Sequence, residues 1–263
     1  MTQHLVNRIV QGSDDKLVTE RFLDQVVREF PVTIFFNEQE LVTLLCTPEY
    51  LEDLGVGFLS SEGLLKDLAS LVSVKADYQT GQVWVNTSRP ALVAEKTFMK
   101  RYLTTGCGKG TTFYHVMDAQ MCTPVKSSLQ VSARVLLDLI RQLQLCSELY
   151  RETGGVHSAA LCSGKEMLLY REDIGRHNAV DKIIGHCFRE QVVLEDKFLV
   201  TSGRISSEIL IKVAKQGIPI LVSRSAPTDL ALKVADEVGV TVVGFARGRR
   251  LNVYTHGYRI TLE

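Results

Sequence analysis

The sequence has no excess of charge of either sign. Thirty Lys and Arg residues balance thirty Asp and Glu residues in a chain of 263 residues. Proteins that bind nucleic acids or membrane surfaces generally carry a basic excess, so neither class fits this chain as a whole. A local basic pocket is still compatible with the neutral balance.

Long apolar runs, secretion signals and dense cysteines are also missing. No run approaches the roughly 20 residues that a membrane-spanning helix needs. The polar N-terminus lacks the basic and apolar regions of a signal peptide. The six cysteines are too few for a disulfide scaffold. We therefore expect a cytoplasmic protein with reduced thiols and one large or two small domains.

The first part of the sequence, residues 1–125, predicts a small α+β domain. An irregular start is expected before about Lys16. Two pairs of β-rich runs, each joined by a short turn, indicate hairpins, and apolar residues at helical spacing between them indicate one helix. The hairpins join residues 31–36 with 40–45 and 69–77 with 82–86, and the helix follows Pro48 and ends near Gly63.

The second part, residues 126–263, alternates helical and strand patterns. Such alternation with short loops predicts βαβ units and a parallel sheet that helices cover on both faces. The fold class is therefore α/β, with a domain boundary near residue 125. Helices are expected at 131–143, 179–188, 206–216 and 228–238, and strands at 156–162, 166–171, 197–202, 218–223 and 240–246.

One cysteine differs from the others in its surroundings. Gly106 and Gly108 flank Cys107, so no bulky neighbour shields the sulfur, and Lys109 favours the thiolate form. Accessibility and thiolate character are what a reactive cysteine needs. Cys122 has an intermediate setting. Small buried hydrophobic side chains are the expectation for the remaining four, Cys46, Cys146, Cys162 and Cys187.

Several kinds of chemistry are open to Cys107. The glycine-rich segment around it lacks the spacing of a phosphate-binding P-loop. Cys107, His115 and Cys122 are too far apart for a usual zinc motif, and no Cys-x-x-Cys occurs in the chain. A catalytic Cys–His pair stays open. Persulfide or thiol-exchange chemistry needs only one accessible nucleophilic sulfur, so it is the least demanding choice.

Five arginines follow the ends of expected strands, namely Arg204, Arg224, Arg247, Arg249 and Arg250. If these strands are parallel, their carboxyl ends share one edge of the sheet, where ligands of open α/β sheets bind. Together with hydroxyl-rich helix starts at Ser206 and Thr228, the arginines predict a site for a phosphate-bearing ligand. The alternative is that both hydroxyls are plain N-caps and the arginines are solvated.

Two other segments hold residues whose roles the sequence leaves open. Residues 171–178 join a strand to a helix, and they include Asp173 and His177. These two side chains fit acid–base chemistry or ligand contacts, but equally a helix cap and a surface histidine. His157 follows a Gly-Gly turn and opens a strand, and a structural role is slightly favoured for it.

Six segments together resemble the FdhD/NarQ family of formate dehydrogenase accessory sulfurtransferases. They span most of the chain in order, and the segment at 172–182 is highly specific. The segments are Gly57-Phe-Leu-Ser-Ser-Glu-Gly63, Thr105-Gly-Cys-Gly-Lys109, Thr153-Gly-Gly-Val-His-Ser158, Glu172-Asp-Ile-Gly-Arg-His-Asn-Ala-Val-Asp-Lys182, Thr201-Ser-Gly-Arg-Ile-Ser-Ser-Glu208 and Gly244-Phe-Ala-Arg-Gly-Arg-Arg250.

The resemblance implies a sulfur-transfer function. Members of the family take sulfane sulfur from a cysteine desulfurase, carry it as a persulfide and pass it to the molybdenum cofactor of formate dehydrogenase. That cofactor, a bis-guanine dinucleotide, is their cargo. Cys107 matches the carrier cysteine. Many members have Cys-x-x-Cys in this loop, whereas here Cys107 stands alone, and Cys122 is a distant candidate for a second thiol.

The resemblance also implies a binding site and a fold. The second part of the chain would be a cytidine-deaminase-like, three-layer α/β domain. The zinc signature of deaminases is absent, so no deamination and no metal site are expected. A homodimer is expected. Cargo contacts fall on Phe245, Ala246, Arg247, Gly248, Arg249 and Arg250, together with Arg204, Arg224, Ser206 and His177.

Two other functions compete with sulfur transfer. A non-catalytic chaperone would bind the cofactor and deliver it, with Cys107 as a mere contact residue. The need for the cysteine separates this function from the first. A nucleotide-dependent enzyme that uses His177 and Asp173 would turn over a nucleotide substrate, but no recognisable catalytic motif supports it.

Overall fold

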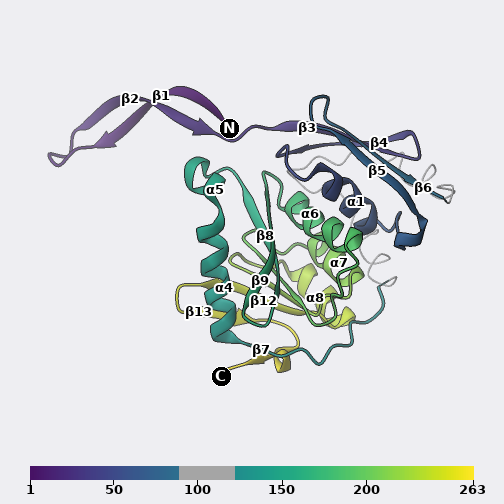
Figure 1. The fold of residues 1–263 in the computed structure, drawn as a ribbon. Coiled ribbons are helices and arrows are strands. Elements are labelled where there is room, and N and C mark those ends of the chain that lie inside the picture. Colours follow the sequence, from purple (N-terminus) through teal and green to yellow (C-terminus); the bar gives the residue numbers. More distant parts are fainter. Residues whose placement is uncertain (89–121) are drawn as a thin grey trace.

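The computed structural model describes residues 1–88 and 122–263, so Cys107 and Lys109 lie outside the described residues. It consists of a projecting hairpin, a four-stranded sheet with one helix, and a six-stranded sheet with helices on both faces (Figure 1). Among the described helices, none is long and apolar enough to cross a membrane.

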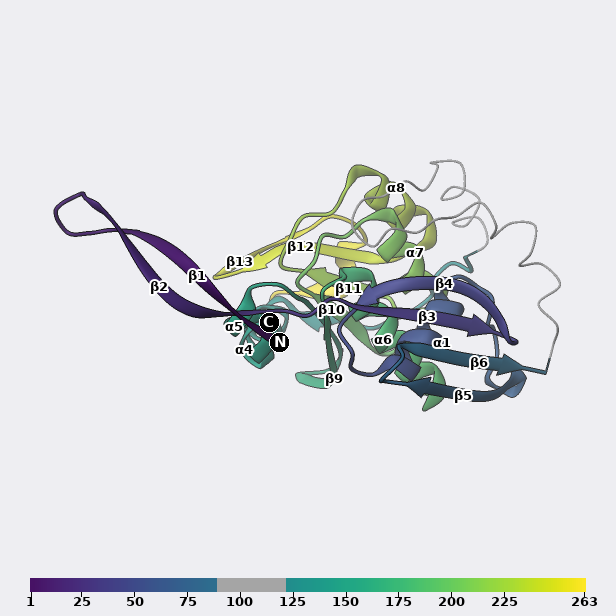
Figure 2. The ribbon, with the colours of Figure 1, turned by 90° about the horizontal axis from the view of Figure 1, so that it is seen from above.

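The chain begins with a regular hairpin rather than an irregular segment. Strands β1 (Thr2–Gln11) and β2 (Leu17–Val26) pair along their whole length and project from the rest of the molecule (Figure 2). The expectation of an irregular start before Lys16 is therefore wrong. The apolar residues of β1 come in adjacent pairs, Leu5-Val6 and Ile9-Val10, so the apolar/polar alternation that indicates a strand is lacking.

The next segment forms the predicted α+β unit. The sheet order is β4-β3-β6-β5, and helix α1 packs on one face. Both hairpins and the helix are confirmed. Asn37 and Glu38 link the first two strands with positive φ, which a tight hairpin turn of this kind requires. The bounds are β3 (Phe30–Phe36), β4 (Gln39–Cys46), α1 (Leu51–Ser61), a 3-10 turn (Leu68–Ser70), β5 (Leu71–Asp77) and β6 (Gln82–Thr87).

The larger sheet has the order β13-β12-β11-β10-β8-β9 and is mixed rather than parallel. Only β10, β11 and β12 run parallel, because β8–β9 and β12–β13 are hairpins that turn at Gly164 and Gly248. The bounds are β8 (His157–Ser163), β9 (Glu166–Asp173), β10 (Phe198–Thr201), β11 (Ile220–Ser223), β12 (Thr241–Arg247) and β13 (Arg250–Val253).

Helices cover both faces of this sheet, which confirms the α/β class. Helices α6, α7 and α8 share one apolar core with it, and α4 shares another on the opposite face (Figure 1). Helix α5 and strand β13 were not expected. The helices are α4 (Ala133–Cys146), α5 (Glu148–Thr153), α6 (Arg176–Arg189), α7 (Ser207–Lys215) and α8 (Asp229–Val238), and the remaining elements are β7 (Val131–Ser132), a 3-10 turn (Gly257–Arg259) and β14 (Ile260–Thr261).

Helix α1 from the first part crosses helix α6 from the second with almost no space between their backbones. A Cβ atom at Gly57 would overlap the carbonyl oxygen of Asp181, and one at Gly185 would overlap the carbonyl oxygen of Asp53. Only glycine permits backbones to approach this closely. These two glycines therefore set the distance between the smaller unit and the larger sheet.

Buried polar contacts reinforce this crossing. Lys182 on α6 is fully buried, and its ammonium group lies 2.7 Å from Asp173 and 2.8 Å from the Thr47 hydroxyl. The residue before it, Asp181, accepts hydrogen bonds from Ser61 of α1 and from Lys212 of α7. A buried charge that loses its partner costs several kcal/mol, so these pairs fix the two parts against each other. The domain boundary near residue 125 stays a prediction.

We expect Gly57→Ala to destabilise the protein by about 3 kcal/mol, the upper end of the usual cost of overpacking, because the added methyl group meets backbone that cannot rotate away. Urea unfolding measures the change. Gly257→Ala is the matched control, because a Cβ there makes only an ordinary contact, 3.6 Å from Val253. Equal losses in the two variants would contradict the account of the crossing.

Candidate functional site

The ends of β11 and β12 are hydrogen-bonded to the loops that follow β10 and β11 at one edge of the sheet. The Ser223 hydroxyl donates to the carbonyl oxygen of Gly203 over 2.6 Å. The Phe245 amide donates to the carbonyl oxygen of Ser225 over 3.0 Å. The three parallel strands therefore bring their carboxyl ends together, as the pattern predicts. The predicted site residues of these loops lie along this edge.

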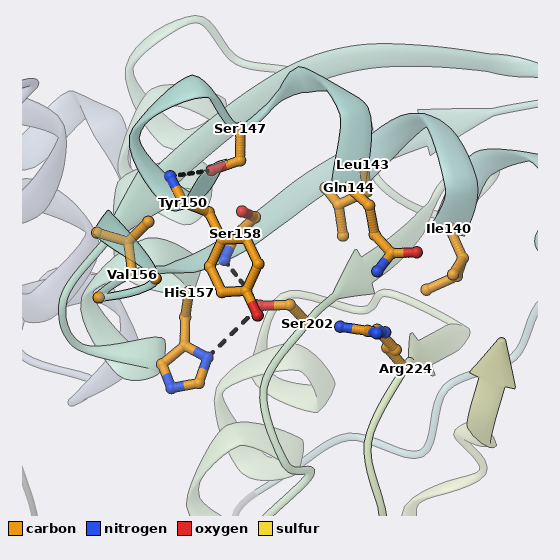
Figure 3. A pocket seen from close by; sticks show the side chains of 12 residues that line it. Ile140, Leu143, Gln144, Ser147, Tyr150, Val156, His157, Ser158, Ser202 and Arg224 are labelled. Carbon is orange, nitrogen blue, oxygen red and sulfur yellow. Dashed lines mark hydrogen bonds between the residues drawn. The ribbon is translucent and has the colours of Figure 1, made fainter. Parts of the chain in front are cut away.

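A cavity of about 350 Å³ opens beside this edge. It lies between α4 and α5 on one side and the start of β8 and the ends of β10 and β11 on the other (Figure 3). Its wall combines apolar side chains with a few polar groups, the usual make-up of a small-molecule site. The lining residues are Ile140, Leu143, Gln144, Ser147, Tyr150, Gly154, Gly155, Val156, His157, Ser158, Ser202 and Arg224.

Arg224 is the predicted arginine that reaches the cavity. Its guanidinium faces the side-chain amide of Gln144 (Figure 3). With the amide oxygen turned toward Arg224, that oxygen lies 3.0 Å from Nε and accepts from the guanidinium. Because an amide is a neutral partner, the positive charge of Arg224 is not cancelled there. This charge can attract an anionic ligand.

His157 adds a neutral ring to the cavity wall. Its Nδ1 lies 3.5 Å from the Ser202 hydroxyl (Figure 3). Burial lowers the pKa of His157, and the positive charges of Arg176 and Arg204 lower it further. The slight preference for a structural histidine stays a prediction, and the structure adds that this ring lines the cavity. Arg204 itself is exposed at the rim of the same region.

A chain of polar side chains supports the wall from behind. The Glu172 carboxylate accepts from the Ser147 hydroxyl over 2.5 Å and from the Tyr170 hydroxyl over 2.7 Å. Tyr170 in turn lies 3.1 Å from the Ser158 hydroxyl. Burial and the bond to Glu172 raise the pKa of Tyr170, so its proton stays in place. Glu172 therefore holds the α4–α5 junction against β8.

The segment Phe245 to Arg250 lies at the end of β12, next to the cavity loops. Phe245 has a φ of 50°, in the left-handed region, where the β12–β13 pairing is irregular. A bulky residue in that conformation is strained, and such strain concentrates at functional sites. Arg247 extends over the Phe245 ring at 5.5 Å. Arg247, Gly248, Arg249 and Arg250 are exposed, Ala246 is buried, and none of these residues lines the cavity.

The starts of α7 and α8 differ in how they are capped. Thr228 caps α8 conventionally, since its hydroxyl accepts from the Ala231 amide. Ser206 occupies the N-cap position of α7 without a side-chain cap bond. Its buried hydroxyl finds no hydrogen-bond partner among the described residues. The plain N-cap interpretation is therefore correct for Thr228 and wrong for Ser206.

His177 and Asp173 have different surroundings. His177 Nε2 lies 3.3 Å from Glu208 on α7, yet burial and the nearby charge of Lys212 lower its pKa to about 2. The neutral ring therefore donates to Glu208. Asp173 is fully buried, pairs with Lys182 and accepts from the Gly175 amide. Asp173 is an ion-pair partner whose carboxylate also accepts from Gly175, the N-cap residue of α6, and this buried pairing favours the structural alternative over an acid–base role.

The described cysteines follow expectation in three cases of four. Cys46, Cys162 and Cys187 are buried, and burial raises the pKa of each thiol to about 12. Cys146 is exposed at the end of α4, contrary to expectation, because that last turn faces solvent. Cys122 is partly buried. Among residues 1–88 and 122–263, no group of three or more potential metal ligands comes together.

Sequence reasoning missed the cavity wall that α4 and α5 contribute. Gln144 and Tyr150 come from an amphipathic helix and from a short helix that was not expected, so no motif marks them. The Gly154–Gly155 turn is the signal that could have indicated this wall. It lies between α5 and β8 and lines the cavity.

We expect His177 to make stability depend on pH. The unfolded chain has a histidine pKa of about 6.5, whereas the folded pKa is about 2. Between these values only the unfolded state binds the proton, so this contribution is fully present above pH 6.5 and is lost as pH falls. His177→Gln should reduce the slope of unfolding free energy against pH between 7 and 5 by up to about 1.4 kcal/mol per unit.

Urea unfolding at several pH values measures that slope, with His4→Gln in the exposed strand β1 as the control. An unchanged slope in His177→Gln, or a His177 ring that NMR shows to be protonated at pH 5, would contradict the account.

Comparisons with known proteins agree with this structure. Residues 27–261 match the FdhD/NarQ family. "Sulfur carrier protein FdhD" of Bacillus subtilis (strain 168) is 44% identical over 237 residues, 90% of each chain. The protein of the same name from Listeria monocytogenes serotype 4b (strain F2365) is 48% identical over 238 residues, 90% of this chain and 91% of that protein.

A solved structure shares the fold as well. A Desulfotalea psychrophila protein, described as a formate dehydrogenase accessory protein, superposes with a TM-score of 0.78 at 25% identity. The match covers 98% of this chain and 99% of the other. The family match, the high identity to its members and the common fold lead to one conclusion: this chain belongs to the FdhD/NarQ family.

Proposed function

We propose that this protein is a sulfur carrier that accepts persulfide sulfur on Cys107 and transfers it to the molybdenum cofactor of formate dehydrogenase. The observation that carries the cargo-binding part of the proposal is the cavity at the edge of the sheet, where Arg224 faces a neutral amide and Arg204 is exposed at the rim. A sulfur carrier of this kind must hold an anionic cargo as well as a sulfur atom. The names of the relatives support the sulfur-carrier role.

The first chemical step is a thiol exchange. The Cys107 thiolate attacks the outer sulfur of a persulfide on a cysteine desulfurase. A sulfur–sulfur bond forms on Cys107 as the old one breaks, and the desulfurase cysteine leaves as a thiolate. No net oxidation occurs in this step. Lys109, two residues away in the sequence, would favour the attacking thiolate.

The second step delivers the outer sulfur to the cargo, where it replaces an oxygen ligand of the metal. This sulfur is reduced from sulfane to sulfide, so the step takes up two electrons and two protons and releases water. A reduced metal centre in the cargo is the class of electron donor required. The thiol of Cys107 is regenerated and can accept a further sulfur.

The cargo phosphates and guanine would be held at the sheet edge. Arg224 in the cavity and Arg204 at its rim supply positive charge. The buried Ser206 hydroxyl is a donor at the start of α7, and neutral His177 positions Glu208 beside it. Helix starts favour phosphate groups. The segment Phe245 to Arg250 adds exposed arginines on a strained strand end.

Formate dehydrogenase and a cysteine desulfurase are the proposed partners, and a homodimer is the proposed assembly. The competing function is a chaperone that binds and delivers the cofactor without sulfur chemistry. The cavity and its arginines favour either function equally, since binding the cargo is common to both. The need for Cys107 therefore decides between them.

We expect Cys107→Ala to lose sulfur acceptance completely. Incubation with a cysteine desulfurase and cysteine should raise the mass of the wild-type chain by about 32 Da, one sulfur atom, and a reductant should remove it. Intact-protein mass spectrometry measures the gain. Cys146→Ala, which removes an exposed cysteine outside the motif, is the control and should gain the sulfur normally. A wild-type chain that gains no sulfur from an active desulfurase would favour the chaperone.

We expect Arg224→Gln to weaken binding of guanosine diphosphate, used as a probe for the cargo, by about tenfold or more. Hydrogen bonds to charged groups contribute about 1.5–3 kcal/mol, and glutamine keeps the polarity without the charge. Isothermal titration calorimetry gives the dissociation constants. Arg134→Gln removes an exposed arginine at the other end of α4 and should bind as the wild type does. Equal affinities in all three proteins would place the nucleotide elsewhere.

A further inference from the structure

The N-terminal hairpin, strands β1 and β2, is an arm that joins the rest of the molecule beside the cavity. The two strands form a sheet of their own and project from the body (Figure 2). At the base of the arm, β2 contacts the short helix α5, which forms part of the cavity wall (Figure 1). The segment that follows β2 begins with Val27. The arm therefore meets the body at the wall of the candidate site.

Two glycines separate this segment from the cavity. Gly154 and Gly155 line the cavity, whereas Val27 does not. A Cβ atom at Gly155 would lie 2.5 Å from Val27 Cγ1, so the side-chain position of Gly155 faces Val27. Because neither glycine has a side chain, the wall at this point is only one backbone thick. A shift of Val27 is therefore passed to the cavity with no flexible side chain in between.

The contact with Val27, rather than the backbone conformation, is what requires glycine at position 155. Gly154 has a φ of 65° and ends α5 as a left-handed cap, a conformation that favours glycine. Gly155 does not have a positive φ, so its backbone would accept alanine. Apart from Val27, the nearest atom to a Cβ at this position is Thr153 Oγ1, at an ordinary contact distance of 3.6 Å. The Val27 side chain is therefore the obstacle to a side chain at position 155.

Helix α5 is held firmly at its start and only lightly at its end. None of its residues is buried. Its start is fixed to the sheet, because the Ser147 hydroxyl donates to the Glu172 carboxylate. At its end, the Gly154 amide donates to the Tyr150 carbonyl oxygen over 2.8 Å, a bond that stays within the segment itself. Packing against Val27 therefore supports this end of the wall from outside.

We propose that Val27 is a positioning residue for the cavity: it supports the Gly154–Gly155 turn and thereby sets where Tyr150 lies against a ligand. The arm determines the position of Val27 in turn, because β2 ends at the residue before it. The arm and the cavity are then coupled, and coupling between two sites acts in both directions. This inference deepens the cargo-binding part of the proposed function and rests on it for the identity of the ligand.

A supported wall binds a ligand more tightly than a loose one. The Tyr150 ring extends from α5 toward the polar groups of His157 and Ser158 (Figure 3). A ligand that packs against this ring must order the end of α5 wherever that end is free to move. Support from Val27 removes part of that cost before the ligand arrives, which is the general advantage of pre-organisation.

The test compares the wild type with Gly155→Ala, Val27→Ala and the double variant. The first change creates a clash, because the methyl groups of valine do not turn away easily. The second leaves a gap. In the double variant the two Cβ atoms would lie 3.4 Å apart, in ordinary contact, so clash and gap cancel. We expect each single variant to weaken binding of guanosine diphosphate by about fivefold or more, and the double variant to bind within about twofold of the wild type. Isothermal titration calorimetry measures the affinities.

Hydrogen exchange of the Gly154 amide is a second readout, and it needs no ligand. This amide closes the last turn of α5, so its exchange should speed up about tenfold or more in each single variant and slow again in the double variant. Val26→Ala is the matched control, because Val26 is an exposed valine next to Val27 and should change neither readout. Thermal unfolding of each variant checks that the body stays folded.

A double variant that binds and exchanges no better than Gly155→Ala overturns the proposal. Single variants that behave as the wild type does overturn it as well, since the wall then does not depend on Val27. If the wild type binds no guanosine diphosphate, the cargo site of the proposed function fails on its own account. The exchange pattern of the four proteins then still decides whether Val27 supports the wall.

Discussion

The close crossing of α1 and α6 is the constraint on which the rest of the structure depends. Gly57 and Gly185 let the two backbones touch, and Lys182 joins Asp173 to Thr47 across the same contact. Asp173 also accepts from the Gly175 amide at the start of α6. One buried network thus holds the smaller unit and begins the helix that leads to His177. The highly specific segment at 172–182 serves this junction more than direct chemistry.

The same junction also holds one wall of the cavity in place. The backbone carbonyl of Glu172 accepts from the Thr47 hydroxyl, while its carboxylate holds Ser147 and Tyr170 at the cavity wall. A change in the distance between the smaller unit and the larger sheet would therefore also shift the cavity wall that α4 and α5 form. On the opposite side of the cavity, hydrogen bonds join the carboxyl ends of the three parallel strands, and this arrangement places the arginines along one edge of the sheet. A cavity between two walls that are held in place is pre-organised, which would lower the cost of ordering it around the proposed cargo.

Local patterns predicted most elements, and tertiary contacts explain most failures. The hairpin at Asn37 and Glu38 and the strand-end arginines could be found because turn chemistry and strand order are local signals. The cavity wall from Gln144 and Tyr150 could not, since packing of α4 and α5 against the sheet creates it. Asp173 was predicted as a candidate acid because its ion pair with Lys182 forms only in the folded protein and cannot be recognised in the sequence. The projecting arm was missed because its apolar side chains lie on both faces of the hairpin, so the sequence shows no alternating pattern.

The most direct test of the central claim follows one labelled sulfur atom from Cys107 to the cargo. The chain is loaded with heavy-isotope persulfide, mixed with the guanine-dinucleotide molybdenum cofactor in its reduced form, without any added reductant, and sampled by mass spectrometry. The account predicts that the label leaves the protein and appears on the cofactor, at a rate that falls at least tenfold in Arg224→Gln. Label that reaches the cofactor equally fast without Arg224, or that never reaches it, would contradict the account.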